Sequence, residues 1–173
     1  MASKSIQRQM TVDFNVYDSD NKLMGVASVT LPTLEWISST MNGAGIAGNV
    51  EVVARGMMEA MTLGMNFRMV TKEAVALSGP DRHKITLRNA EQYEDPVYGL
   101  IGIERVKHVF VVMPKNMNFG SIGQATTHDG SGQYAVRYWA MYIGQENVLN
   151  IDQLSGRCII GGKDYRADIN AAI

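Results

Sequence analysis

The feature that most constrains the fold of this chain is a strict alternation between residues 61 and 70. Five large apolar residues occupy every second position, at Met61, Leu63, Met65, Phe67 and Met69. The intervening positions are small or polar. Successive side chains of a β-strand point to opposite faces, so the pattern predicts a strand with one packed face and one wet face.

Strand signals recur along most of the chain. Two strands joined by a turn are predicted over residues 10–16 and 23–31, where Pro32 ends the second. Further strands are expected over residues 84–89, 104–113, 133–143, 146–154, 157–160 and 163–169. Residues 89–102 are predicted as a linker and residues 115–132 as a loop.

One short helix is expected over residues 71–78, because Gly79 and Pro80 supply a stop signal. No internal repeat or domain boundary interrupts the pattern. The sequence therefore predicts one mainly β domain over residues 1–173, an antiparallel β-sandwich or barrel with one short α-helix.

Residues 38–49 form a long glycine-rich stretch. Its glycines, Gly43, Gly45 and Gly48, match the spacing of a dinucleotide fingerprint. The residues before Gly43 are too polar for a buried parallel strand, and β-branched valines follow where a helix should start. We instead interpret residues 38–49 as an extended assembly loop. Its inter-subunit residues would be Asn42, Gly43, Gly45, Ile46 and Gly48, with Ile46 as the apolar anchor.

Composition argues against several functions. The chain has 16 Lys and Arg against 17 Asp and Glu, a net charge of -1, and so lacks the basic excess of a nucleic-acid binder. Cys158 is the single cysteine, which excludes an internal disulfide. No apolar run has the length of a membrane span, and residues 1–9 lack the apolar core of a signal peptide. The three histidines have no metal-ligand spacing. We expect no enzymatic activity, metal or cofactor.

The order of the elements resembles the major tail tube proteins of contractile-tailed phages and phage-tail-like bacteriocins. The sharpest match runs from the strand Ser28-Val29-Thr30-Leu31-Pro32, through Met41-Asn42-Gly43-Ala44-Gly45, to Gly48-Asn49-Val50-Glu51-Val52. The alternating strand and the short helix then follow in the expected order, and the resemblance spans most of the chain.

This resemblance implies a structural protein made in the host cytoplasm and mature in a virion tail or tail-like particle. Subunits would form hexameric rings whose strands join into a ring-shaped lumen barrel, and the rings would stack into a tube. The expected partners are further copies of the chain, a contractile sheath protein, baseplate and tail terminator proteins and a tape measure protein. DNA would pass only in transit, with no small-molecule substrate. Thr62, Asn66 and Arg68 would then face the lumen.

Two alternatives remain open from the sequence. A type VI secretion tube protein has a closely related architecture. A monomeric small-molecule-binding β-barrel of the lipocalin type would show the same strand patterns but would not assemble. Assembly state separates the second alternative, and genomic neighbours separate the first.

Overall fold

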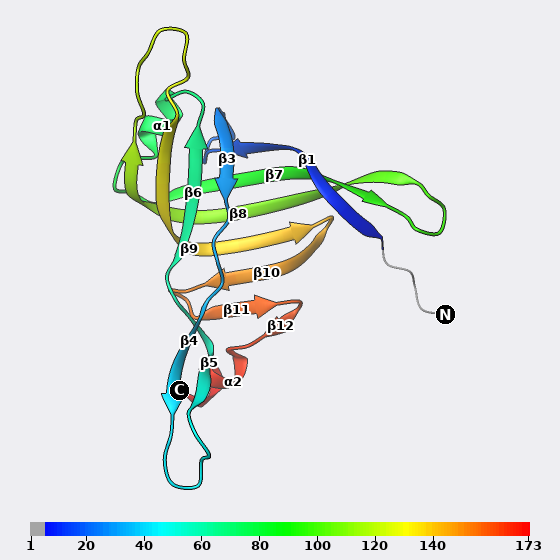
Figure 1. The fold of residues 1–173 in the computed structure, drawn as a ribbon, viewed down its shortest axis with the longest axis vertical. Helices are drawn as coiled ribbons and strands as arrows, with labels where there is room; N and C mark the ends of the chain where they lie inside the picture. Colours follow the sequence, from blue (N-terminus) through cyan, green and yellow to red (C-terminus); the bar gives the residue numbers. More distant parts are fainter. Residues whose placement is uncertain (1–5) are drawn as a thin grey trace.

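The computed structural model describes residues 6–173, which form a mainly β, antiparallel fold (Figure 1). The strands are β1 (Gln7–Tyr17), β2 (Leu23–Met24), β3 (Val26–Thr30), β4 (Trp36–Met41), β5 (Val50–Met58), β6 (Met61–Phe67), β7 (His83–Glu94), β8 (Ile101–Asn118), β9 (Gly130–Ile143), β10 (Glu146–Asp152), β11 (Arg157–Ile160) and β12 (Lys163–Asp164). The helices are α1 (Lys72–Ala76) and α2 (Ala167–Ala172). The predicted fold class is confirmed, but the prediction of a single helix is wrong.

The strands form two layers that share β8 and β9. The back layer runs in the order β11, β10, β9, β8, β7 and β1, using residues 138–143 of β9 and 101–112 of β8. The front layer consists of β3, β6, residues 130–136 of β9 and 113–118 of β8. Figure 1 shows β3 and β6 crossing the strands of the back layer.

A β-bulge at Arg137 carries β9 from one layer to the other. Val136 pairs with Val112 of β8, whereas Tyr138 pairs with Val111, so Arg137 is the extra residue. Bulges bend a strand and increase its twist. The two longest strands can therefore belong to both layers, and the layers close on each other without a separate connection.

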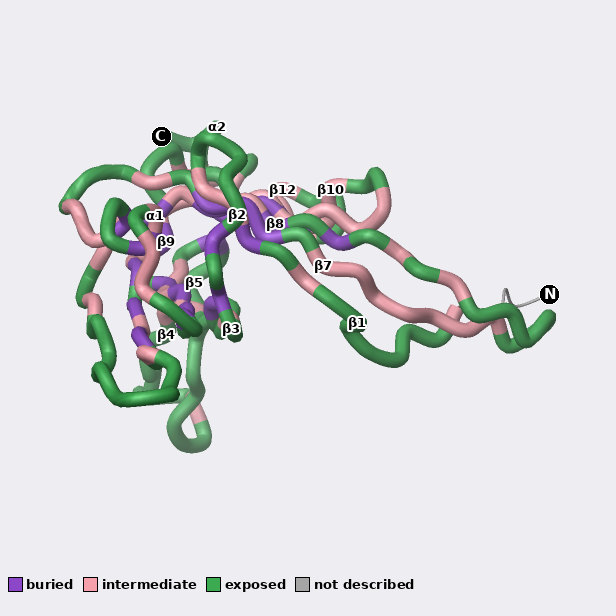
Figure 2. The backbone as a smooth tube through the Cα atoms, turned by 90° about the horizontal axis from the view of Figure 1, so that it is seen from above, coloured by how far each residue is buried: buried purple, intermediate pink, exposed green. Residues whose placement is uncertain are grey.

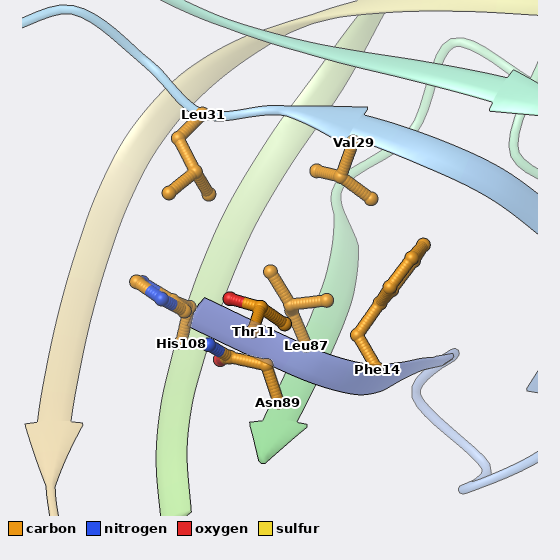
Figure 3. Close-up of a pocket in the computed structure, with 7 residues that line it drawn as sticks. All are labelled: Thr11, Phe14, Val29, Leu31, Leu87, Asn89 and His108. Atoms are coloured by element: carbon orange, nitrogen blue, oxygen red, sulfur yellow. The ribbon is translucent and has the colours of Figure 1, made fainter. Parts of the chain in front are cut away.

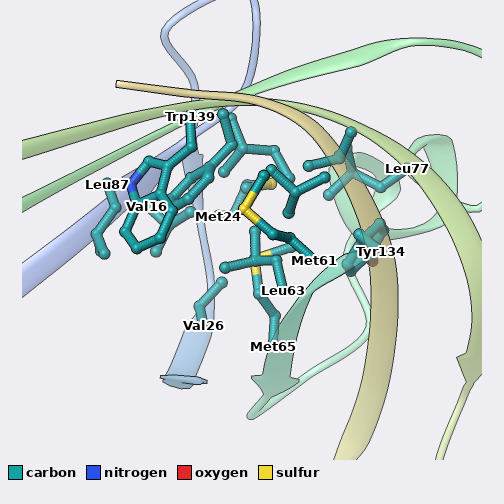
Figure 4. Packing of buried hydrophobic residues seen from close by; sticks show 14 of the residues in the cluster. Val16, Met24, Val26, Met61, Leu63, Met65, Leu77, Leu87, Tyr134 and Trp139 are labelled. Carbon is teal, nitrogen blue, oxygen red and sulfur yellow. The ribbon is translucent and has the colours of Figure 1, made fainter. Parts of the chain in front are cut away.

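The core fills the space between the two layers (Figure 4). The front layer contributes Met61, Leu63, Met65 and Phe67 from β6, each at most 1% exposed. The back layer contributes buried side chains from every long strand: Val16, Ile85, Leu87, Phe110, Trp139, Leu149 and Ile151. The predicted one-sided character of β6 is thus confirmed. Met69 is an exception, because β6 ends at Phe67 and Met69 is exposed.

The two faces of β6 are expected to respond oppositely to an added carboxylate. Phe67→Asp should prevent folding, because it removes a buried ring and leaves a charge among apolar side chains, at a cost of more than about 3 kcal/mol. Asn66→Asp should be tolerated, since Asn66 is exposed and loses one surface hydrogen bond to Ser28 Oγ. Circular dichroism and thermal melting measure both. Equal melting temperatures for the two variants would contradict the face assignment.

The first predicted hairpin is mostly absent. Only β2 pairs with β1, through Val16 with Met24 and Tyr17 with Leu23. After Gly25 the chain crosses to the front layer, and β3 pairs with β6 instead. The physical reason is burial: Val26 and Val29 pack against the core only when β3 lies beside Met65 and Phe67.

Three further boundaries differ from the sequence prediction. Strands β7 and β8 pair continuously from His83↔Val112 to Glu94↔Ile101, so most of the predicted linker is sheet. Strand β8 continues past Pro114, which lies beyond the end of β7 and therefore forgoes no hydrogen bond on that side. The predicted last strand ends at Asp164, and α2 follows.

Two segments project from the two-layer body. One is the hairpin of β4 and β5, which extends past β11 and β12 in Figure 1. The other is an arm built from the distal parts of β1, β7 and β8, which Figure 2 shows as a long extension with mostly exposed or half-buried backbone. The tip of this arm exposes Val97, Tyr98, Leu100 and Ile101.

Candidate assembly surfaces

The outer side of the front layer is a polar sheet face. Strand register places on it a set of small and uncharged polar residues: Ser28, Thr30, Thr62, Gly64, Asn66, Ser131, Gln133, Ala135, Asn116 and Asn118, with half-buried Met113 at one end. Hydrogen bonds join neighbouring strands across it, from Asn66 Nδ2 to Ser28 Oγ (2.8 Å) and from Asn116 Nδ2 to Gln133 Oε1 (3.3 Å). We call this surface the polar face.

Lys115 is a bulge residue between Pro114 and Asn116, so it has no partner in the register, but its side chain reaches the polar face. Its Nζ lies 3.5 Å from Thr62 Oγ1. Two of the predicted lumen residues, Thr62 and Asn66, lie on this face. Arg68 follows the end of β6, where its backbone N–H donates to Gly25 O and its carbonyl accepts from His128 N. Sequence alternation alone could not show where the strand ends.

The front layer has two free edges within residues 6–173. Strand β3 pairs only with β6. Residues 113–118 of β8 pair only with β9, because β7 begins at His83, opposite Val112. Four consecutive antiparallel strands leave β3 and β8 running in opposite directions. A β3 edge could therefore pair antiparallel with the β8 edge of another copy. Unpaired edges are templates for association with another chain.

The β4–β5 hairpin has one apolar side. Cross-strand register groups Ser39, Met41, Val50 and Val52 on one face of the ribbon and Ser38, Thr40, Glu51 and Val53 on the other. Met41, Val50, Val52 and Val53 are each 44–52% exposed. A two-stranded ribbon is at best marginally stable in water on its own. Its exposed apolar side is therefore a candidate contact surface.

The predicted assembly loop is shorter than the sequence suggested. Residues Ser38–Met41 belong to β4, so the loop begins at Asn42 and ends at Asn49. The β-branched and apolar residues flanking it pair as strands. Gly43, Gly45 and Gly48 all have positive φ, and a Cβ on any of them would meet no atom within 4 Å. Ile46 is half-buried, and the two ends of the loop are joined by a hydrogen bond from Asn42 Nδ2 to Asn49 Oδ1 (3.2 Å).

The base of the hairpin is fixed to the C-terminal segment. Gly56 is buried with φ +71°, and a Cβ there would lie 2.6 Å from Arg166 Cγ. Arg166 Nη1 donates to Gly56 O (3.4 Å), and Arg55 pairs with Asp168 of α2 at 3.3 Å. This α2 contact, absent from the sequence prediction, orients the projecting hairpin.

The buried side chains of His108 and Tyr134 are part of the packed core. His108 is 3% exposed, and burial lowers its pKa to about 4, so the ring is neutral at physiological pH. Its Nδ1 accepts a hydrogen bond from Trp139 Nε1 (3.3 Å), and the ring stacks on Phe110. Burial likewise raises the pKa of Tyr134 to about 12.

The hollow in Figure 3 lies beside His108, between β3 and the strands β1, β7 and β8. Its volume is about 150 Å³. Larger open hollows of about 520 Å³ and 420 Å³ lie at the base of the β4–β5 hairpin and over the polar face. Within residues 6–173, no group of three metal-ligating side chains comes together. No helix in the same range is long and apolar enough to cross a membrane. His83 hydrogen-bonds to Gly79 O, and His128 lies in the loop before β9.

The fold is a mainly β subunit with two free strand edges, a polar sheet face and a projecting hairpin. The fold resembles two chains of an extracellular contractile injection system in its extended state. One is from the PVC sheath/tube terminator, with a TM-score of 0.56, 8% identity and coverage of 80% of this chain and 99% of that one. The other is from the PVC sheath-tube complex, with a TM-score of 0.54, 9% identity and coverage of 78% and 91%.

The chain belongs to the phage tail tube protein FII family, whose model matches residues 8–173. No curated protein matches the chain in sequence. The family confirms the resemblance to tail tube proteins, and with it a structural rather than an enzymatic role.

Proposed function

We propose that six copies of this chain close into a ring in which the front layers join edge to edge. The observation that carries this proposal is the pair of free edges at opposite sides of the polar face. Joining β3 of one subunit to residues 113–118 of β8 in the next continues the antiparallel order around the ring. Such closure removes both edges, which is how barrels avoid uncontrolled association.

The polar face would line the lumen of this ring. A basic lumen would bind passing DNA through its phosphates, with an affinity that grows with each Lys or Arg contact. Hydroxyl and amide side chains keep the channel wet without holding the DNA. Thr62 and Asn66 would face the channel, as would the exposed Arg68 at the end of β6, and Lys115 would lie beside Thr62.

The β4–β5 hairpin would join each subunit to a neighbour in the tube. Its apolar side, formed by Met41, Val50 and Val52, supplies the contact surface. The tip at residues 42–49, including Asn42, Gly43, Gly45, Ile46 and Gly48, would order against the neighbouring copy. Because Gly56 and Arg166 fix the base, the hairpin reaches its neighbour in a defined direction.

The partners of such a tube follow from its place in a tail. A contractile sheath would surround it and a terminator would cap it, as the assemblies of the structurally similar chains suggest. Baseplate and tape measure proteins would complete the particle. The tube would serve a phage tail or a tail-like bacteriocin, and it would be made in the host cytoplasm and mature in the particle.

Negative-stain electron microscopy of the purified protein tests the proposal. We expect rings or tubes about 8–10 nm wide, because barrel diameter grows with strand number. Light scattering should show mass increasing with protein concentration. A monomer at all micromolar concentrations, with no rings or tubes in the same preparation, would overturn the proposal and favour the monomeric barrel.

A further inference from the structure

A cationic stripe crosses the outer surface of the back layer. Strand register places four exposed basic residues on it: Lys84 and Arg88 of β7, and Arg105 and Lys107 of β8. Arg88 lies directly opposite Lys107, and Arg105 lies opposite Ala90 in the next pair along the same face. Like charges directly opposite each other on neighbouring strands are destabilising. The stripe therefore lowers the folding stability of the isolated subunit.

The stripe has little internal neutralisation. The ion pairs within residues 6–173 are Arg8 with Glu104 and Arg55 with Asp168, and none involves the stripe.

Four acids share the outer side of the back layer. Asp13 lies opposite Ala90, and its Oδ1 accepts the Phe14 N–H. Glu94 lies at the far end of β7, where it accepts from Gln9 Nε2. Asp152 of β10 and Asp164 of β12 lie toward the other edge of the layer, where Asp152 accepts from Leu154 N and Ser155 N and Asp164 accepts from Arg166 N. The charge of the stripe is thus available to a partner.

Tyrosine rings hold the central cations against the sheet. The Arg88 guanidinium lies 4.7 Å from the centroid of Tyr17, and Lys107 Nζ lies 5.7 Å from that of Tyr142. Tyr138, opposite Val111, extends the aromatic surface. Cation–π contacts favour an ordered orientation of these long side chains, and the rings add an apolar platform beside the charges.

The stripe and the polar face lie on opposite sides of the core, because each is the outer side of one layer. If the polar face lines the lumen, the stripe faces outward from the tube. We propose that this stripe is the docking surface for an acidic segment of the contractile sheath subunit. The inference rests on the proposed tube function and adds the position and chemistry of the sheath contact.

Charge reversal in assembled tubes tests the proposal. The variant is Arg88→Glu with Lys107→Glu, and the matched control is Lys22→Glu with Lys72→Glu, which changes the net charge equally at exposed positions away from the stripe. Tubes are mixed with the sheath protein of the same particle, and binding is measured by co-sedimentation. We expect normal tubes from both variants, and sheath affinity at least about tenfold weaker for the stripe variant alone.

A neutralising pair, Arg88→Gln with Lys107→Gln, should give an intermediate loss of sheath affinity. A graded loss of affinity in variants that still form tubes separates a charge effect from a folding defect. Poly-glutamate should compete with sheath for wild-type tubes, because it presents the same carboxylates as an acidic segment. Unchanged sheath binding by the stripe variant, equal loss in the control, or no competition by poly-glutamate would overturn the inference while leaving the tube intact. Absence of tubes from the wild-type protein would instead overturn the tube function, and this inference with it.

Discussion

Replacing residues 42–49 with Asn-Gly is expected to leave the subunit folded and to abolish tubes. Met41 and Val50 are directly paired in the hairpin, so a two-residue type I′ turn can join them without disturbing the register. The glycines of the tip have open space around them, and the hydrogen bonds Asn42–Asn49, Ile46–Gly43 and Gly48–Ile46 stay within residues 42–49. The melting temperature should therefore stay within a few degrees of the parent.

The loss of tubes should be complete, because the tip would be lost from every subunit in the tube. Electron micrographs and a melting curve from the same preparation measure the two effects. Ile46→Ser, which keeps the loop length, should weaken assembly less than the full replacement. Persisting tubes would show that the tip is dispensable. Loss of the folded state would show that it belongs to the core after all.

A second large effect is expected from cysteines placed at the two free edges. Ser28→Cys combined with Asn116→Cys, or with Asn118→Cys, should cross-link neighbouring subunits in assembled tubes. Directly opposite residues in antiparallel strands have Cβ atoms roughly 4.5–5.5 Å apart, close to the roughly 3.5–4.5 Å of a disulfide. Asn116 and Asn118 share the polar face with Ser28, so the two combinations sample two registers.

A non-reducing gel should then show a ladder that ends at six subunits. Each single-cysteine variant is the control, since it can form nothing larger than a dimer. Cys158 does not interfere, because it is buried and burial raises its pKa. Tubes that form normally but give no ladder with either combination would refute the pairing of β3 with β8. A ladder ending at another number would refute the hexamer.

Local patterns were sufficient for the elements whose signal lies within a few residues. The alternation from Met61 to Phe67 determined which face of β6 is buried, because side-chain direction in a strand has a period of two. Helix α1 was predicted from a local stop signal, Gly79 and Pro80. The structure adds the N-cap, in which Thr71 Oγ1 accepts a hydrogen bond from Ala74 N (3.2 Å). The sequence also indicated Thr62 and Asn66 as residues of the wet face.

Pairing between distant segments was decided only by the tertiary structure. Strand β3 pairs with β6 and not with β1, because only beside β6 do its apolar side chains reach the core. Pro114 is tolerated in β8 because β7 does not extend far enough to pair with it. Arg88 and Lys107 are 19 residues apart in sequence and meet only through the β7–β8 register, so neither marks a charged surface on its own. Local periodicity specifies the faces of a strand, whereas burial and hydrogen bonding across the whole sheet specify its neighbours and hence the assembly surfaces.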